Sequence, residues 1–217
     1  MSSSPAVLTK APVASAAGLA WLRWLVLLAV TFACYAPGLH GGFVFDDDVN
    51  ILGNDRLRIS GLDREELWAA AWSGDAGPLG RPVALLTFAL NLYFGGANPY
   101  TFKLVNVLIH LGNVLLIGAL AQTVYEAFVQ RRWPKATTWT IDRWAGWMVS
   151  ALWALHPINL TSVLYVVQRM TSLSALFGLV GLLIYVRYRA KTWQRQDLSH
   201  PVWKACLLYT SPSPRDS

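Results

Sequence analysis

The chain has 217 residues, of which 54% are hydrophobic and only 14% are charged. Charged residues make up about a quarter of an ordinary soluble domain, so this composition argues against one, and the aromatic and aliphatic content excludes a disordered chain. The only two cysteines are Cys34, in an apolar run, and Cys206, near the end. A scaffold held by disulfides is therefore excluded as well.

Long segments of the chain lack Asp, Glu, Lys and Arg altogether. These segments are residues 24–45, 82–102, 104–125, 144–168 and 170–186. A helix needs about 20 apolar residues to cross a bilayer core of about 30 Å. The sequence therefore predicts an all-α integral membrane protein.

Charged residues indicate which ends of these helices face the cytoplasm. The basic clusters are Arg131, Arg132, Lys135 and Arg143, followed by Arg187, Arg189, Lys191 and Arg195. Short cytoplasmic loops carry an excess of Lys and Arg, so both clusters and the N-terminal tail 1–17 are predicted to be cytoplasmic. The loop 38–99 contains eight of the 12 acidic residues. We expect it on the outer face.

This orientation predicts four transmembrane helices, at residues 19–37, 100–129, 144–160 and 163–186. His156-Pro157 is expected to end the third helix, because the residue before proline disfavours helical backbone. Segment 82–94 is too short to cross, since 13 residues of helix reach only about 20 Å. We expect it to lie at the outer interface instead.

A second short interfacial helix is predicted in the outer loop. Asp63 and Glu66 have the spacing of a capping box. The residues on one face of the following turns are Leu67, Trp68, Ala71 and Trp72. This apolar face could lie on lipid or on the helix bundle.

The predicted membrane domain covers residues 18–190 and is followed by a cytoplasmic segment, 191–205. The last residues, 206–217, read CLLYTSPSPRDS and do not continue the preceding pattern. They resemble the translation of a transposon-type sequencing adapter. We therefore expect the natural protein to continue beyond Ala205, which would make this chain an N-terminal fragment.

Three adjacent acids, Asp46, Asp47 and Asp48, follow the first predicted span directly. A carboxylate held at the outer membrane surface is a candidate general base. Two other interpretations remain open, a solvated acidic loop and a divalent-cation site.

Basic residues near the same face are candidate contacts for a phosphate group. Arg169 interrupts the apolar run between residues 144 and 186, and its planar fork suits phosphate recognition. It could instead snorkel to lipid headgroups or pair with a structural acid. Arg81 and Lys103 lie near the outer ends of neighbouring segments, and for them a structural role is favoured.

His110 and His156 also lie in apolar segments. His110 shares a helix face with Lys103, Asn106 and Asn113, and such a polar stripe must face the bundle interior or a cavity. Hydrogen bonding between helices is the commoner explanation. The sequence has no cluster of His and Cys at metal-ligand spacing, so no metal site is predicted. The basic clusters are cytoplasmic, and nucleic-acid binding is not expected.

Three blocks of sequence together carry a family resemblance. They are FDDDVNILGN at 45–54, a block from Arg81-Pro82 to Asn113, and a block from Ala154 to Phe177 that contains His156-Pro157 and Gln168-Arg169. In order and spacing they resemble the membrane domain of the transmembrane and tetratricopeptide-repeat O-mannosyltransferase-like proteins, a branch of the GT-C glycosyltransferase superfamily. Lys103 departs from the family pattern, which has His at this position.

The resemblance implies a partial GT-C-like bundle in which Asp46 and Asp47 are catalytic. It implies that Arg169 or Arg81 contacts the donor phosphate. Lys103, His110 and His156 are the other candidate substrate contacts. The implied reaction transfers a sugar, with inversion, from a polyprenyl-phosphate donor to Ser or Thr hydroxyls of a protein at the outer face, without a further cofactor. The remaining spans and the tetratricopeptide repeats would follow Ala205, so the fragment alone is expected to be inactive.

Two other functional classes stay open. A transporter would share the polar stripes, and it should show inverted repeats or helices broken by Gly or Pro at mid-depth. A non-catalytic membrane anchor for a repeat domain would also explain the topology. For every class the lipid bilayer is a partner. The expected location is the bacterial inner membrane, with the acidic loop in the periplasm.

Overall fold

The computed structural model describes residues 14–74, 80–132 and 144–194, which form helices and turns without any strand. Three segments are long and apolar enough to cross a membrane: Trp21–His40, Pro99–Ala127 and Val166–Thr192. The all-α membrane class is therefore confirmed, and three of the four expected spans correspond to helices of the required length and composition. The tail before residue 14, the basic loop 133–143 and the adapter-like segment 206–217 lie outside the described residues, as does most of the predicted segment 191–205.

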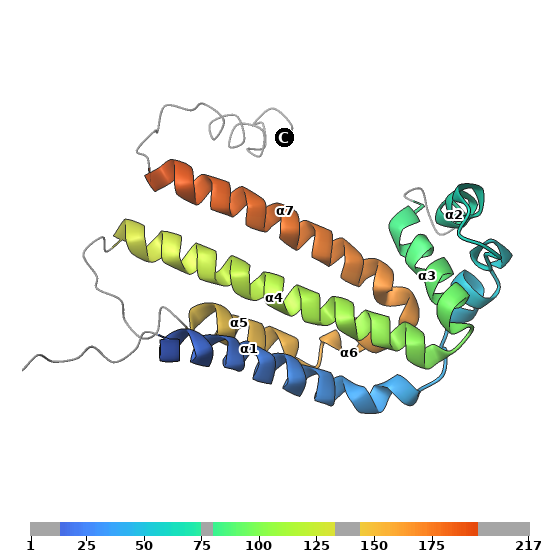
Figure 1. Cartoon of the computed structure of the whole chain (residues 1–217), viewed down its shortest axis with the longest axis horizontal. Helices are drawn as coiled ribbons and strands as arrows, with labels where there is room; N and C mark the ends of the chain where they lie inside the picture. The colour runs from blue at the N-terminus through green and yellow to red at the C-terminus, as the bar shows by residue number, and fades with distance from the viewer. Residues whose placement is uncertain (1–13, 75–79, 133–143, 195–217) are drawn as a thin grey trace, which may run out of the picture.

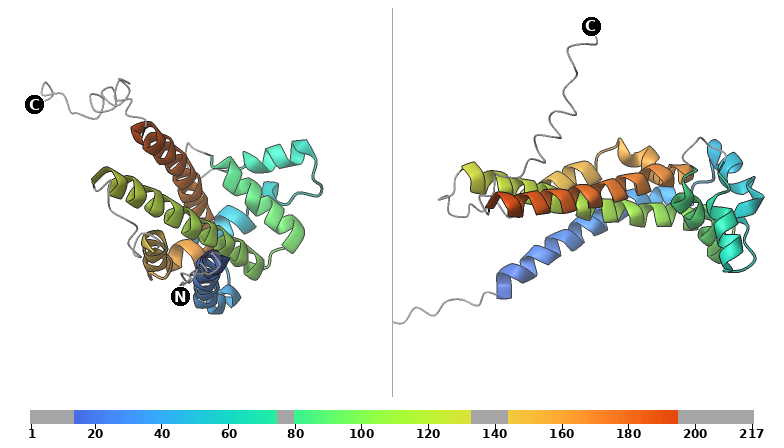
Figure 2. Two further views of the ribbon diagram at one scale, coloured as in Figure 1. Left: turned by 60° about the vertical axis from the view of Figure 1, so that its left-hand side comes forward. Right: turned by 90° about the horizontal axis from the view of Figure 1, so that it is seen from above.

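The long helices run side by side, with α4 (Pro99–Arg132) in the centre (Figure 1). On either side of it lie α1 (Ala14–Tyr35) and α7 (Arg169–Gln194). Helix α1 diverges from the others toward its N-terminus (Figure 2). Much of the apolar surface of α1 and α7 is exposed, as at Trp21 (58%) and Ile184 (64%). Lipid-facing helices have this character, because apolar side chains need no protein cover in a bilayer.

The third predicted span is not a continuous helix. It consists of α5 (Ala145–Ala154) and α6 (Asn159–Leu164), separated by residues 155–158. Pro157 has no N–H to donate to the carbonyl of Trp153. That oxygen accepts from the N–H of His156 at 3.2 Å and from the side-chain amide of Asn159 at 2.6 Å. Ten residues of α5 reach only about 15 Å. The predicted end at His156-Pro157 is thus close to the observed break.

The predicted fourth span begins later than expected. A continuous helix from Val163 is wrong, because the chain is extended at Tyr165 and turns once more before α7 begins at Arg169. The side chain of Asn106, in α4, donates to the carbonyls of Tyr165 and Val166, each at 3.3 Å. The same two carbonyls also accept from the backbone N–H groups of Gln168 and Arg169 in one short turn. The amide of Asn106 thus ties this irregular backbone to α4.

Helix α5 packs closely against α4. The hydroxyl of Ser150 donates to the carbonyl of Val114 at 2.9 Å, and the backbone N–H of Gly146 donates to the side-chain oxygen of Gln122 at 3.0 Å. A Cβ atom on Gly146 would overlap the carbonyl oxygen of Gly118. Small residues let membrane helices approach to this distance.

Residues 41–74 and 80–98 form an outer layer beyond one end of the bundle (Figure 1). It contains α2 (Arg64–Ala71) and α3 (Pro82–Gly95), so both short helices predicted for the outer loop are present. A buried apolar cluster joins this layer to α4 and α7. Its fully buried members are Ile51, Leu57, Ala70, Phe88, Ala89, Phe102 and Val166. The cluster holds the loop after α1 close to the start of α7.

The predicted capping box is only partly correct. Asp63 occupies the N-cap position of α2 without a side-chain bond to the helix. The carboxylate of Glu66 accepts bonds from the hydroxyl and N–H of Ser60, at 2.6 and 2.7 Å, and from the N–H of Gly61 at 3.0 Å. The reason is that the chain folds back before the helix and brings these donors within reach. Trp68 and Trp72 are more than half exposed, so they do not pack on the bundle.

Candidate functional site

Asp47 ties the loop after α1 to the chain just before α7. Its side chain is fully buried. One carboxylate oxygen accepts from the N–H of Val44 at 3.0 Å, and the other accepts from the N–H of Val167 at 2.8 Å. Burial raises the pKa of Asp47 above its ordinary 3.8, while these bonds and the charge of Lys103 act in the opposite direction. Asp47 therefore joins two segments that are 120 positions apart.

Asp46 has the opposite environment, because its side chain is exposed. Its backbone is fixed on both sides: the N–H donates to the hydroxyl of Tyr165 at 3.1 Å, and the carbonyl accepts from the side chain of Asn50 at 2.8 Å. The preceding residue, Phe45, has the left-handed φ of +48° and is 85% exposed. A non-glycine residue rarely adopts this conformation, and such strain is concentrated at functional sites.

Lys103 lies on the buried side of the same loop and is 5% exposed. Its ammonium group donates to the carbonyl of Gly38 at 3.4 Å. A Cβ atom on Gly41 would come within 2.8 Å of the Lys103 nitrogen, so the glycine makes room for the lysine. Lys103 thus places a positive charge beneath the loop, near Asp47.

Arg169 begins α7 and is fully buried. Its Nε donates to the side-chain oxygen of Asn106 at 2.8 Å. Its Nη1 donates to the carbonyl and hydroxyl of Thr87, at 3.1 and 3.4 Å. Its Nη2 donates to the side-chain oxygen of Asn91 at 2.8 Å and to the carbonyl of Phe102 at 2.9 Å. Five acceptors therefore surround a group that has five N–H donors.

Two aromatic rings complete the environment of Arg169. The guanidinium carbon lies 4.6 Å from the ring centroid of Phe88 and 5.4 Å from that of Phe102, and both contacts favour the cation. In this arrangement no N–H remains for a phosphate oxygen. The phosphate contact expected of Arg169 stays a prediction, and it would require these bonds to rearrange.

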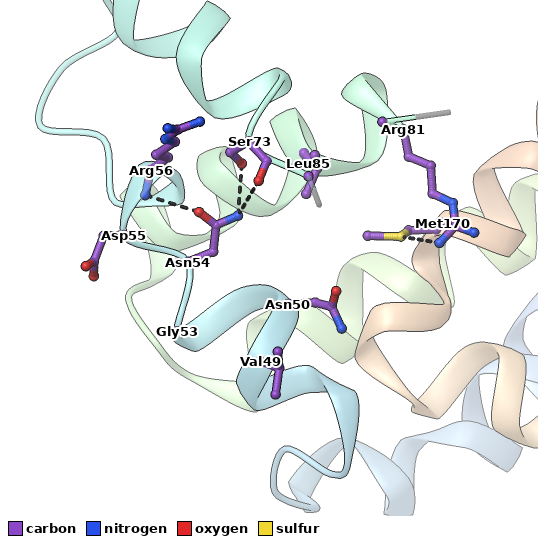
Figure 3. Close-up of a pocket in the computed structure, with 12 residues that line it drawn as sticks. Val49, Asn50, Gly53, Asn54, Asp55, Arg56, Ser73, Arg81, Leu85 and Met170 are labelled. Atoms are coloured by element: carbon purple, nitrogen blue, oxygen red, sulfur yellow. Dashed lines mark hydrogen bonds between the residues drawn. The ribbon is translucent and has the colours of Figure 1, made fainter. Parts of the chain in front are cut away.

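Arg81 lies at the start of α3 with the left-handed φ of +48°. Its side chain is exposed, and Nη1 lies 3.2 Å from the sulfur of Met170. Both residues line a cavity of about 390 Å³ in the outer layer, which we call the outer cavity (Figure 3). Arg81 therefore holds an accessible positive charge next to the first turn of α7.

Polar groups from the outer layer line the opposite wall of the outer cavity. Asn54 donates to the hydroxyl of Ser73 at 2.9 Å and accepts from the backbone N–H of Arg56 at 3.2 Å (Figure 3). Asn50 also lines the cavity, and its side chain is the one that binds the carbonyl of Asp46. Asn50 thus connects the cavity to the backbone of Asp46.

The two histidines do not join this group. His110 is buried, with Nε2 3.4 Å from the carbonyl of Ala154 and its ring 5.1 Å from that of Tyr35. His156 is exposed at the break between α5 and α6, where Nδ1 accepts from the N–H of Ile158. Seven residues of helix separate His110 from Lys103 by about 10 Å. The substrate contacts expected of both histidines stay predictions.

Sequence reasoning missed several residues that the structure brings to the site. Tyr165 and Asn50 hold the backbone of Asp46, and Thr87 and Asn91 hold Arg169. The available signal was the occurrence of polar residues in apolar segments, because such groups need partners there. Among the described residues, no three His, Cys, Asp or Glu side chains are grouped so that they could hold a metal ion.

No family model matches the chain, and no solved structure matches it. Curated relatives do match. Human protein O-mannosyl-transferase TMTC4 is 30% identical over 173 residues, which is 77% of this chain and 23% of that protein. Human TMTC3 is 30% identical over 75% of this chain and 16% of its own length. The Drosophila melanogaster protein O-mannosyl-transferase Tmtc1 is 29% identical over 83% of this chain and 20% of its own length.

The chain therefore spans less than a quarter of the length of these relatives. The matched share of this chain is large enough to include all three motif blocks identified in the sequence. The resemblance drawn from those blocks is confirmed: over about three quarters of its length, this chain is related to the TMTC group of protein O-mannosyl-transferases.

Proposed function

We propose that the complete protein is a membrane glycosyltransferase, which transfers a sugar from a polyprenyl-phosphate donor to Ser or Thr hydroxyls of a protein. The observation that carries this proposal is a juxtaposition at one end of the bundle. Asn50 lines a cavity that contains the accessible cation Arg81, and it binds the backbone carbonyl of Asp46, whose carboxylate is exposed. A base and a phosphate-binding cation are the two groups that such a transfer requires.

In this proposal the two acids have different roles. Asp46 is the general base, because its carboxylate is exposed while its backbone is held by Tyr165 and Asn50. Asp47 cannot easily reach a substrate, since both of its oxygens accept backbone bonds inside the protein. It keeps the loop in place instead.

The reaction proceeds as a single displacement. Asp46 accepts the proton of the acceptor hydroxyl, whose oxygen forms a bond to the anomeric carbon from the face opposite the donor phosphate. The bond between that carbon and the phosphate oxygen breaks, and polyprenyl phosphate leaves with the electron pair, so the configuration is inverted. Arg81 stabilises the charge that grows on the phosphate, and a preorganised donor of this kind contributes roughly 10²–10³ in rate.

We further propose that the chain crosses the membrane four times. The segment 146–166 contacts α4 at two points: Gly146 bonds to Gln122, and Val166 bonds to Asn106. Gln122 and Asn106 are about 24 Å apart along the axis of α4. The broken pair α5 and α6 would therefore serve as the third crossing. With the basic clusters in the cytoplasm, the outer layer faces the opposite side, which is the periplasm if the protein is from the bacterial inner membrane. Helices α2 and α3 would then lie at the outer interface.

A broken crossing is a feature that transporters share, and it favours a transporter as the second candidate. The polar groups at the break are used within the protein, however. The amide of Asn159 donates to the carbonyl of Trp153, and Nδ1 of His156 accepts from the N–H of Ile158. The transferase proposal uses more of the observed geometry.

The test is sugar transfer from a labelled polyprenyl-phosphate sugar to an acceptor protein, in membranes that contain the complete protein. Asp46→Asn should lower the rate by at least about 100-fold, the usual contribution of a general base. Asp48→Asn is the matched control, because Asp48 is an exposed neighbour outside this machinery, and it should transfer at close to the wild-type rate. Equal rates for both variants would remove Asp46 from the mechanism, and transport without transfer would favour the second candidate.

A further inference from the structure

The bonds of Arg169 connect three helices at one point. Its acceptors belong to α3, through Thr87 and Asn91, and to α4, through Phe102 and Asn106. Arg169 itself is the first residue of α7. Because the group is fully buried and all five donors are engaged, the relative position of these helices depends on it.

Residues on both sides of Arg169 touch the proposed site. Two residues before it, the N–H of Val167 donates to the buried carboxylate of Asp47. Directly after it, the sulfur of Met170 lies 3.2 Å from Nη1 of Arg81. A single four-residue segment thus contacts the loop that carries the base and the side chain that carries the cation.

A direct phosphate contact by Arg169 would have a structural consequence. The guanidinium would have to leave its acceptors, and the side-chain oxygens of Asn91 and Asn106 would then remain buried without a donor. Unpaired buried acceptors are strongly unfavourable. The geometry therefore favours a role through the backbone over a role at the phosphate.

We propose that Arg169 is a positioning residue: by anchoring the segment 167–170 to α3 and α4, it sets the distance between the Asp46–Asp47 loop and Arg81. This inference rests on the proposed transferase function. Catalytic groups lose about 100-fold in rate when they are misplaced by about 1 Å, so a loosened anchor should lower the rate of the chemical step more than it weakens donor binding.

The acceptor side of the network provides the decisive variants, because neither Asn91 nor Asn106 carries a charge that could hold a phosphate. In the complete protein, Asn91→Ala and Asn106→Ala should each lower kcat by roughly 10–100-fold, with the KM for the donor within about threefold of wild type. Arg81→Ala should lower kcat by roughly 10²–10³ and should also raise the donor KM, because Arg81 is proposed to contact the phosphate itself. Asn91→Asp keeps an acceptor oxygen for Arg169 and should restore most of kcat.

A matched control lies at the other end of α4. Thr123 donates to the carbonyl of Ala119 within that helix, at 2.7 Å, and it is distant from the network. Thr123→Val should leave both kcat and KM unchanged. If Asn91→Ala and Asn106→Ala keep the wild-type kcat while Arg169→Lys raises the donor KM, Arg169 is a phosphate ligand and the positioning role is refuted.

A second measurement does not depend on activity. Hydrogen–deuterium exchange of the complete protein in lipid nanodiscs reports the protection of residues 43–50. Exchange of this segment should become faster in Asn91→Ala, Asn106→Ala and Arg169→Lys, but not in Arg81→Ala or Thr123→Val. Unchanged exchange in the first three variants overturns the inference. If the wild-type protein transfers no sugar, the proposed function fails, and the exchange data still decide whether Arg169 positions the loop.

Discussion

The close approach of α4 and α5 leads to a quantitative prediction for Gly146→Ala. A methyl group on residue 146 would overlap the carbonyl oxygen of Gly118 and come within 2.9 Å of the Cβ of Gln122. The carbonyl belongs to a helix backbone and cannot rotate away. The two helices must therefore separate by about 1 Å before the methyl group reaches an ordinary contact distance.

The cost of that separation has two parts. Overpacking of a tight contact costs about 1–3 kcal/mol. The separation also weakens the interhelical bonds made by Gly146 and Ser150, each worth about 0.6 kcal/mol in a membrane protein. Alanine recovers about 1 kcal/mol of helix propensity relative to glycine. We expect a net loss of about 1–3 kcal/mol in the free energy of unfolding.

Helix α7 offers a matched control, since a Cβ atom on Gly178 meets no atom within 4 Å. Gly178→Ala should be neutral or stabilise the protein by up to about 1 kcal/mol. Both variants can be compared with the wild type by denaturant titration in detergent micelles, with helix content followed by circular dichroism. If Gly146→Ala unfolds at the same denaturant concentration as Gly178→Ala, the close packing of α5 on α4 is refuted.

Three further predictions concern the outer layer. Phe45→Gly should not lower the melting temperature, because glycine relieves the left-handed backbone strain. A clearly lower melting temperature of the variant in thermal denaturation would contradict this account. The bonds from Ser60 hold the pKa of Glu66 below its ordinary 4.5. The carboxylate should therefore stabilise the loop above that pH, and its contribution is lost as the pH falls through the lowered value. The protection factor of the Ser60 amide, which is its exchange rate corrected for the intrinsic pH dependence of exchange, should fall in acid in the wild type and stay constant with pH in Glu66→Gln. The charge of Lys103 lowers the pKa of Asp47, and the ionised Asp47 holds the loop through the N–H groups of Val44 and Val167. Lys103→Met should therefore shift the loss of this loop structure, and with it the acid limb of transfer activity, to higher pH. An unshifted profile would show that this charge does not act on Asp47.

Local sequence was sufficient wherever a property depends on the composition of one segment. The membrane class and the helices at 82–95 and 99–132 follow from runs of apolar residues, because a bilayer demands backbone bonding within each segment. The break at His156-Pro157 follows from the missing N–H of proline. Acids followed by a polar turn at 45–54, together with the two later blocks, were enough to indicate the family.

The environment of each polar group could not be predicted in the same way. Asp46 and Asp47 are identical neighbours, yet one is exposed and the other is fully buried. Their difference arises because Val167, 120 positions later, supplies a donor to only one of them. Arg169 likewise finds its acceptors between 63 and 82 positions away.

Apolar helices with acids at one end can be predicted from the amino-acid sequence alone, because helix formation and membrane insertion depend on residues within a single segment. The tertiary structure decided which acid faces solvent, which arginine is available to a ligand and which is held by five protein acceptors. These properties depend on donors and acceptors from distant segments, and only the packing of α3, α4 and α7 brings those segments together.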